Sequence, residues 1–150
     1  MNSLSIDGWC GHRHIALGAG VTSDGSGVEI KGTNGNDAVD LIVTDTGGDN
    51  RHISGSYGNS GITLDRTKQG DTDTVVGALD DGTPISISAS KLVLDVNFTG
   101  SVGNDSYVGS DQSGHIEGMR NGREIEAVRQ GGIPGIDLAD YLIALFPMHV

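Results

Sequence analysis

Glycine, asparagine and aspartate interrupt this chain about every ten residues, which limits each regular element to a short segment. Between these interruptions apolar and polar side chains alternate, as expected for strands that bury one face. Residues 91–98 form the longest such segment, and the pattern predicts one strand there. Seven shorter segments show the same alternation: 28–31, 38–43, 61–65, 74–79, 84–89, 106–108 and 124–128.

Tight turns between these strands are indicated by dipeptides that pair Asn or Asp with Gly, because these residues tolerate positive φ. Five such dipeptides occur: Asp7-Gly8, Asp24-Gly25, Asn34-Gly35, Asp81-Gly82 and Asn121-Gly122. A chain of 150 residues is long enough for one domain with one core. We therefore predict a single, mainly β domain over residues 1–150, built as a β-roll, sandwich or barrel of many short strands.

The charge balance excludes several classes of protein. Twenty acidic residues against nine Lys and Arg give a net charge of −11, which disfavours nucleic acid as a partner. The many Gly and Asp residues disfavour an all-helical fold. No apolar run approaches the roughly 20 residues of a membrane-spanning helix, and residues 1–20 lack the pattern of a secretory signal. The sequence therefore predicts no membrane span, and export by a leaderless route if the protein is extracellular or on the cell surface.

One short helix is predicted near the C-terminus, over residues 136–146. Asp137 can cap its start, and Pro147 would stop it. Four apolar residues fall at helical spacing: Leu138, Tyr141, Leu142 and Leu145. This helix has two interpretations: it packs on the β-structure of its own chain, or it docks a partner subunit and makes a homo-oligomer.

A weak internal repeat relates two parts of the chain. Residues 28–40 align without gaps on residues 96–108, with five identical positions among thirteen. Both segments carry a strand end, a Gly-rich loop with Asn-Asp, and the start of another apolar stretch. The similarity indicates either a duplication or two independent solutions to the same turn.

Both copies of this repeat contain a nine-residue motif, Gly-Thr-Asn-Gly-Asn-Asp-Ala-Val-Asp at 32–40 and Gly-Ser-Val-Gly-Asn-Asp-Ser-Tyr-Val at 100–108. Each resembles one unit of the RTX, or haemolysin-type, calcium-binding repeat family. In that family glycines let carbonyl groups approach calcium and the Asp supplies a carboxylate. The resemblance implies calcium-binding residues at six positions: Asp37, Asp105, Asn36, Asn104, Gly35 and Gly103.

The spacing of the two motifs departs from that family. RTX units recur in tandem, because the ion lies between successive turns of a parallel β-roll, whereas these two motifs are 68 residues apart. The alternative is that both are ordinary turns, in which Asn and Asp side chains cap the backbone.

A second group of candidate ligands lies near the N-terminus, where Cys10, His12 and His14 alternate with other residues. On an extended segment their side chains point to one side, and a thiolate with two imidazoles suits zinc or copper. The alternative is an edge segment without a ligand role.

The sequence contains no nucleophile elbow, Walker loop, zinc-protease motif or dinucleotide fingerprint. It therefore favours a non-enzymatic function over an enzymatic one. The leading hypothesis is a secreted or surface-exposed acidic β-protein that binds calcium through its Gly/Asn/Asp loops. One alternative is a virion or surface assembly subunit that uses the apolar C-terminal helix. Another is a small β-barrel enzyme or ligand carrier with Asp or His in an internal cavity, which predicts polar residues on the inward face of strands.

Overall fold

Twelve β-strands and no helix make up the described part of the computed structural model, which covers residues 3–47, 50–92, 95–120 and 122–132. The strands are β1 Ser3–Cys10, β2 Arg13–Val21, β3 Gly27–Asn34, β4 Asp37–Gly47, β5 Asn50–Tyr57, β6 Ser60–Gln69, β7 Thr72–Leu79, β8 Pro84–Leu92, β9 Asp95–Val102, β10 Asp105–Gln112, β11 His115–Arg120 and β12 Arg123–Gly132. The predicted helix over residues 136–146 lies outside the described residues. Nothing in the described ranges forms a helix of the length and apolarity needed to span a membrane.

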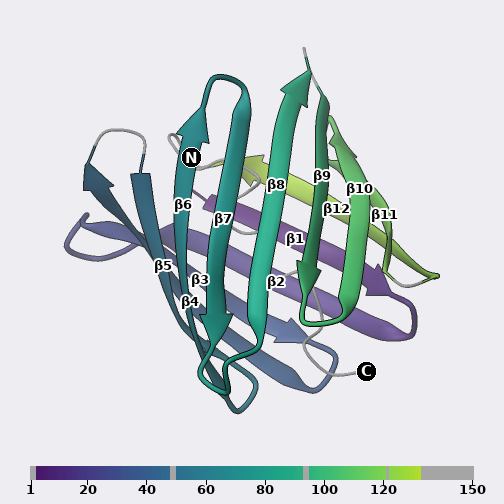
Figure 1. Cartoon of the computed structure of the whole chain (residues 1–150), viewed down its shortest axis with the longest axis horizontal. Coiled ribbons are helices and arrows are strands. Elements are labelled where there is room, and N and C mark those ends of the chain that lie inside the picture. The colour runs from purple at the N-terminus through teal and green to yellow at the C-terminus, as the bar shows by residue number, and fades with distance from the viewer. Residues whose placement is uncertain (1–2, 48–49, 93–94, 121, 133–150) are drawn as a thin grey trace.

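Every strand pairs antiparallel with its neighbours in the chain, and β1 closes the sheet against β12 (Figure 1). This closing ladder runs from Ser3 opposite Gly132 to Cys10 opposite Ile125. Closure leaves no strand edge for pairing with other chains. Of the three architectures that the sequence allows, the barrel is therefore confirmed.

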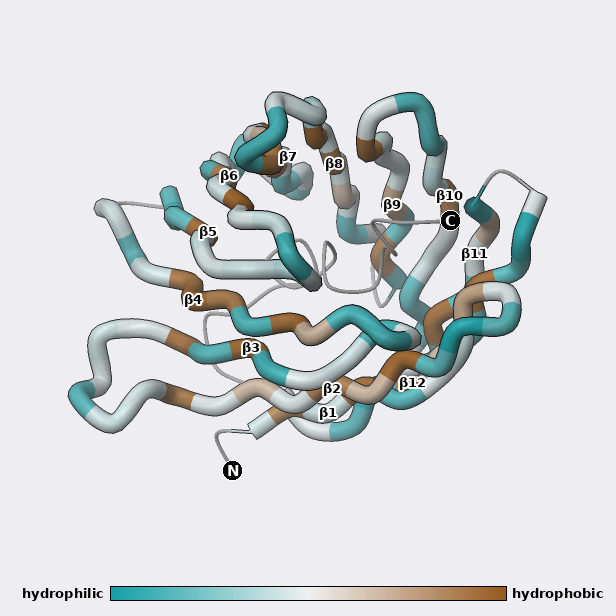
Figure 2. Tube along the Cα trace, turned by 90° about the horizontal axis from the view of Figure 1, so that it is seen from below, coloured by the Kyte–Doolittle hydropathy of each residue, from teal (hydrophilic) through white to brown (hydrophobic). Residues whose placement is uncertain are grey.

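Alternation of side chains decides which face of each strand is inside. On β4, for example, Val39, Leu41 and Val43 are buried, while Asp40 and Ile42 between them are exposed. The same period of two recurs around the barrel as apolar and polar steps along the trace (Figure 2). Because the inner positions are mostly Ile, Leu and Val, one continuous apolar core forms inside.

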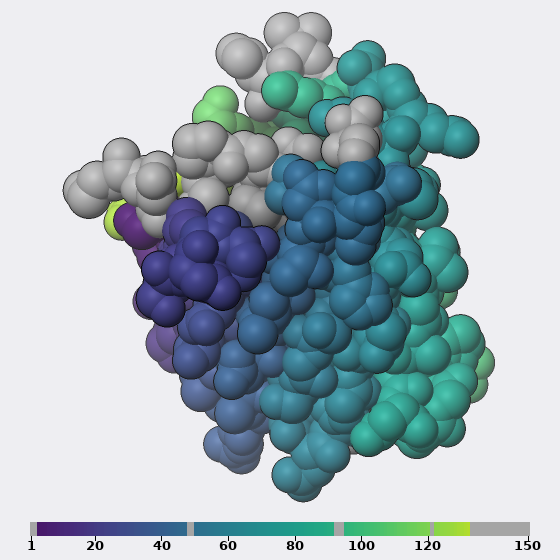
Figure 3. All heavy atoms as spheres, turned by 90° about the vertical axis from the view of Figure 1, so that its left-hand side faces the viewer, coloured from purple at the N-terminus to yellow at the C-terminus, as the bar shows by residue number. Residues whose placement is uncertain are grey.

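The barrel is flattened into two layers. In Figures 1 and 2, β6–β9 form one layer, and β1–β3 with β12 cross it obliquely on the other side. The space-filling view shows neighbouring strands packed side by side as a continuous wall (Figure 3).

An inward-facing glycine lies within each odd-numbered strand, where the chain passes very close to one neighbouring strand, which is β12 for β1 and the preceding strand for the others. At Gly32 an added Cβ would lie 2.0 Å from the carbonyl oxygen of Ala16, and at Gly77 it would lie 2.0 Å from that of Thr63. No side chain fits at such distances, so glycine permits the close strand approach. The six glycines are Gly8, Gly32, Gly55, Gly77, Gly100 and Gly118.

Four of these six glycines are followed, three residues later, by a second glycine that begins a two-residue turn. At Gly35 and Gly103 φ is +63° and +60°, which suits the first position of a type II′ hairpin turn. The same arrangement occurs at Gly11 and Gly58. The repeat between residues 28–40 and 96–108 is thus part of a wider pattern, because four hairpins of the barrel share an inward glycine and a turn glycine three residues later.

Two predictions from the sequence are wrong. Residues 91–98 do not form one strand, because β8 ends at Leu92 and β9 begins at Asp95, and these two residues pair across the reversal. Asp7-Gly8 is not a turn, since both residues pair with β12 in the middle of β1. In both cases the local residue types are compatible with the predicted structure, but long-range pairing decides the outcome.

Candidate functional site

The two segments that resemble RTX units are the hairpins β3–β4 and β9–β10. Gly35-Asn36 and Gly103-Asn104 form their two-residue turns, and Asp37 and Asp105 are the first residues of the strands that follow. β4 and β10 are not neighbours in the barrel, so the two motifs do not lie side by side in the sheet.

Each aspartate of these motifs contacts an arginine on the inner side of the barrel. Arg13 donates to Asp37 at 3.3 Å, and Arg120 donates to Asp105. Each arginine therefore offsets the negative charge of a carboxylate that the RTX resemblance predicts as a calcium ligand. Among the described residues, no three His, Cys, Asp or Glu side chains are grouped so as to hold a metal ion. Calcium binding at these hairpins stays a prediction.

Other turn aspartates cap the backbone. Asp24 accepts hydrogen bonds from the side chain and amide of Ser26 and from the hydroxyl of Thr22, which lower its pKa to about 2. Asp81 accepts bonds from the amide and hydroxyl of Thr83 in the same manner. Part of the acidity of this chain therefore serves turn formation.

Cys10, His12 and His14 do not share a face, because the chain reverses at Gly11-His12. Cys10, the last residue of β1, points into the barrel and is buried. His14 lies on the outer face of β2, opposite Trp9. His12 is exposed in the turn. The expected common face is wrong, since it assumed that the segment continues as one strand.

One end of the barrel, formed by the turns after the odd-numbered strands, contains a buried polar cluster that we call the turn-end cluster. Burial raises the pKa of Tyr57, and the nearby Tyr107 and Asp37 raise it further, against a hydrogen bond from Asn34. Burial also raises the pKa of Tyr107, against the positive charge of Arg120. Four buried residues of this cluster come from separate strands: Asn34, Tyr57, Tyr107 and Arg120.

Ion pairs also lie inside the opposite end of the barrel. Arg66 donates to Asp73 at 3.2 Å, with both side chains largely out of water. Arg129 donates to Asp111 at 3.0 Å, and Asp111 also accepts the backbone amide of Gly114. Polar groups thus flank the apolar core at both ends.

Nearly all Lys and Arg side chains occupy inward registers of the strands, where several of them pair with inward aspartates, whereas the outward registers carry carboxylates almost without Lys or Arg. Eight of the nine Lys and Arg residues occupy inward registers: Arg13, Arg51, Arg66, Lys68, Lys91, Arg120, Arg123 and Arg129. Eight carboxylates occupy outward registers: Asp7, Glu29, Asp40, Asp65, Asp95, Glu117, Glu124 and Glu126. Within the described strands, only Lys31 places a Lys or Arg on the outside. The outer surface therefore carries a strongly negative field.

Exposed apolar side chains accompany these carboxylates on one part of the wall, which we call the acidic face. It consists of outward residues of β10, β11, β12, β1 and β2: Asp7, Trp9, His14, Val108, Glu117, Met119, Glu124, Glu126 and Val128. Trp9 is 53% exposed, and Val108, Met119 and Val128 are exposed as well. No outward position of these five strands holds Lys or Arg.

Strand register brings the key residues of the acidic face together. Glu117 lies opposite Glu126, and Glu126 in turn lies opposite Trp9. Two like charges in facing positions destabilise a sheet unless a cation offsets them. Among the described residues, neither Glu124 nor Glu126 forms an ion pair.

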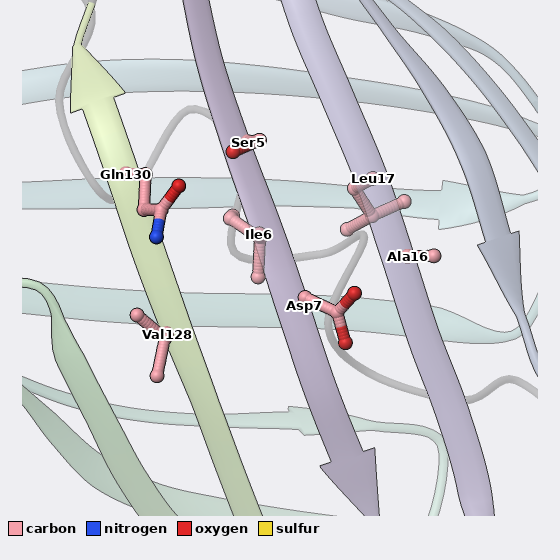
Figure 4. Close-up of a pocket in the computed structure, with 7 residues that line it drawn as sticks. All are labelled: Ser5, Ile6, Asp7, Ala16, Leu17, Val128 and Gln130. Atoms are coloured by element: carbon pink, nitrogen blue, oxygen red, sulfur yellow. The ribbon is translucent and has the colours of Figure 1, made fainter.

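Two open depressions lie side by side on this face. One, of about 530 Å³, is lined by Trp9, Glu124 and Glu126 together with Asp7 and Val128. The other, of about 490 Å³, shares Asp7 and Val128 and extends toward β2 (Figure 4). The acidic face therefore offers concave, negatively charged surface next to an exposed indole.

His14 on β2 contacts both Trp9 and Asp7 of the acidic face. Its ring lies 4.8 Å from that of Trp9 between centroids, and its Nε2 is 2.9 Å from Asp7 Oδ1. Among these residues the sequence pointed only to His14, and it did not indicate a role for Trp9 or for Glu117, Glu124 and Glu126. The alternation of Glu124, Glu126 and Val128 was visible, but their contact with Trp9 depends on the closure of β12 against β1.

Comparison with known proteins identifies no relative. No family model, curated protein or solved structure matches this chain.

Proposed function

We propose that this protein is a binding module that takes a positively charged partner on its acidic face. The excess of carboxylates over Lys and Arg in the outward registers of the strands is the observation that carries the proposal. Carboxylates facing solvent attract cations over a distance of several ångströms and speed their association. Polar groups inside the barrel, by contrast, engage one another, as Arg66 and Asp73 do.

Concentration of apolar surface on the same strands supports this choice of face. A uniformly charged exterior would serve solubility alone. Here Trp9, Met119 and Val128 are exposed among the carboxylates, and exposed apolar groups within a polar surface are typical of interaction sites. Calcium at Asp37 and Asp105 is a separate proposal, because those carboxylates lie on the inner side.

Salt-dependent binding of a cationic probe tests the proposal. Wild-type protein should bind a decalysine peptide at low ionic strength in a calorimetric titration, and binding should weaken steeply as salt is added. A variant with Asp7→Asn, Glu117→Gln, Glu124→Gln and Glu126→Gln should lose most of this affinity. A matched variant with Glu29→Gln, Asp40→Asn, Asp65→Asn and Asp95→Asn loses the same charge elsewhere and should retain it. Absence of binding at low salt, or equal loss in both variants, would contradict the proposal.

A second candidate function is a ligand carrier, which predicts polar residues on the inward face of strands. Arg66, Asp73, Asp111 and Arg120 occupy such positions, next to an apolar core. Native mass spectrometry of the purified protein checks this function, because a carrier should retain a small apolar molecule that solvent extraction removes.

A further inference from the structure

Trp9 is the only tryptophan of the chain, and it is 53% exposed although it lies within the paired strand β1, next to its last residue. Leaving so large an apolar group exposed forgoes the free energy that burial would supply. His14 packs against its ring from the β2 side. On the β12 side, the neighbour of Trp9 in the ladder is Glu126.

Charge restricts what can cover this indole. A second copy of the chain would bring its own acidic face against this one, and like charges would repel. A nucleic acid is repelled for the same reason. A cationic side chain is attracted both by the carboxylates and by the negative face of the aromatic ring.

Among cationic side chains, arginine fits this pair of neighbours best. Its planar guanidinium stacks on an indole and can donate two parallel hydrogen bonds to one carboxylate, whereas lysine acts as a compact, strongly hydrated charge. Trp9 supplies the flat surface, and Glu126 on the adjacent strand supplies the carboxylate. Both residues line the same depression.

A second carboxylate extends the depression along β12. Glu124 precedes Glu126 by two residues, so both side chains stand on the same face of the strand, and Glu124 lines the same depression. Two basic side chains on one face of an extended segment have a similar spacing. Val128, on the other side of Glu126 along β12, offers an apolar contact to the same segment.

We infer that Trp9 and Glu126 form an arginine-binding pair, and that the partner is an extended, arginine-bearing segment of another protein. This inference rests on the proposed function, since it names the chemistry of the partner that the acidic face takes. In the complex a guanidinium covers the Trp9 indole and donates to Glu126, while a second basic side chain lies at Glu124.

Intrinsic fluorescence reports on this contact directly, because Trp9 is the sole tryptophan. Titration with a blocked tetra-arginine peptide at low salt should change the Trp9 emission, and a tetra-lysine peptide should bind about two- to fivefold more weakly. Glu126→Gln should weaken binding of the arginine peptide by a similar factor. Calorimetry of Trp9→Ala, which lacks the fluorophore, should show that arginine and lysine peptides now bind equally.

Control variants and outcomes separate this inference from the proposed function. Val76→Ala removes an equally exposed apolar group from β7, and Glu29→Gln removes an outward charge from β3, so both should bind like wild type. If the cationic peptides bind but Trp9→Ala and Glu126→Gln leave the preference for arginine intact, the inference is wrong while the proposed function stands. If neither peptide binds at low salt, both are wrong. Quenching by a neutral oligosaccharide that is indifferent to salt would also overturn the inference, in favour of a carbohydrate partner.

Discussion

Tyr57 and Tyr107 interact across the inside of the barrel, although four strands separate β5 from β10 in the sheet. Each side chain is almost completely buried, and the charge of one would act on the other. Side chains from β5 and β10, the strands that flank β6–β9 on either side, therefore come together at the turn-end cluster. Ionising either hydroxyl would place a negative charge at a buried position, where loss of solvation disfavours it.

Alkaline pH should destabilise the protein through these two tyrosines. Burial raises the pKa of Tyr57 and Tyr107 above the ordinary value of about 10, so the folded state holds both protons more tightly than the unfolded state. Their contribution to stability is complete below about pH 10 and is lost as pH rises beyond it. Denaturant unfolding at pH 8–11.5 should show this decline, and absorbance at 295 nm should show later ionisation in the folded chain. Tyr57→Phe should reduce the decline; a wild-type stability that is constant up to pH 11.5 would contradict the prediction.

Close strand approach makes Gly77 much less replaceable than Gly18. An added Cβ at Gly77 would meet the carbonyl oxygen of Thr63 at 2.0 Å, whereas at Gly18 it would meet nothing within 4 Å. Gly77→Ala should therefore lower the free energy of unfolding by at least about 3 kcal/mol, because backbone has to move. Gly18→Ala should change it by no more than about 1 kcal/mol, in the stabilising direction. Urea unfolding of the two variants measures the difference, and equal effects would show that the close approach is not needed.

Loss of Asp73 should remove a carboxylate that pairs with a buried guanidinium inside the barrel. Its partner Arg66 is 2% exposed, and Arg51 lies opposite Arg66 on β5. Asp73→Asn should lower the free energy of unfolding by about 3 kcal/mol, because the buried Arg66 guanidinium loses the negative charge of this carboxylate. Glu29→Gln breaks the exposed pair with Lys31 and should cost less than about 1 kcal/mol. The same unfolding assay compares them; an Asp73→Asn variant as stable as Glu29→Gln would mean that water reaches Arg66.

Local residue patterns were sufficient for the class of the fold. Alternating apolar residues such as Val39, Leu41 and Val43 occupy the inside of β4 as the period predicts, and Gly82 lies in a predicted turn with φ of +91°. Closure was not predictable, because the ladder between Ser3 and Gly132 joins the two ends of the described chain. Alternation identifies the buried face of a strand, but it does not identify the strand's partner.

The candidate site escaped sequence reasoning for the same reason. Trp9 and Glu126 are more than a hundred residues apart in the chain and become neighbours only when β1 pairs with β12. The repeat was only partly visible, since its common signal is a glycine at the strand interior and another three residues later, as at Gly32 and Gly35. The surrounding residues differ from one hairpin to the next, so pairwise alignment detected just one pair of copies.

Cys10 should react slowly with thiol reagents in the folded protein. Burial raises the pKa of its thiol, against the positive charges of Arg120, Arg123 and Arg13, and its side chain is almost inaccessible. At pH 8 the native protein should therefore react with Ellman's reagent far more slowly than the urea-unfolded chain. A Cys10→Ala, Ser5→Cys variant moves the thiol to an exposed position of the same strand and should react quickly. Equal rates for native and unfolded wild type would show that Cys10 is accessible.

If calcium binds at the β3–β4 hairpin, replacing Arg13, which contacts Asp37, should increase the stabilisation by calcium. The guanidinium of Arg13 contacts the carboxylate that the ion would need, so calcium must compete with it. If the site exists, millimolar calcium should raise the melting temperature by about 2–4 °C for each kcal/mol of binding free energy. The rise should be larger in Arg13→Gln, which releases the carboxylate, and absent in Asp37→Asn. Asp24→Asn serves as the control, because Asp24 caps a turn outside both motifs. Identical melting temperatures in calcium and in EDTA for wild type and Arg13→Gln would exclude calcium at this hairpin.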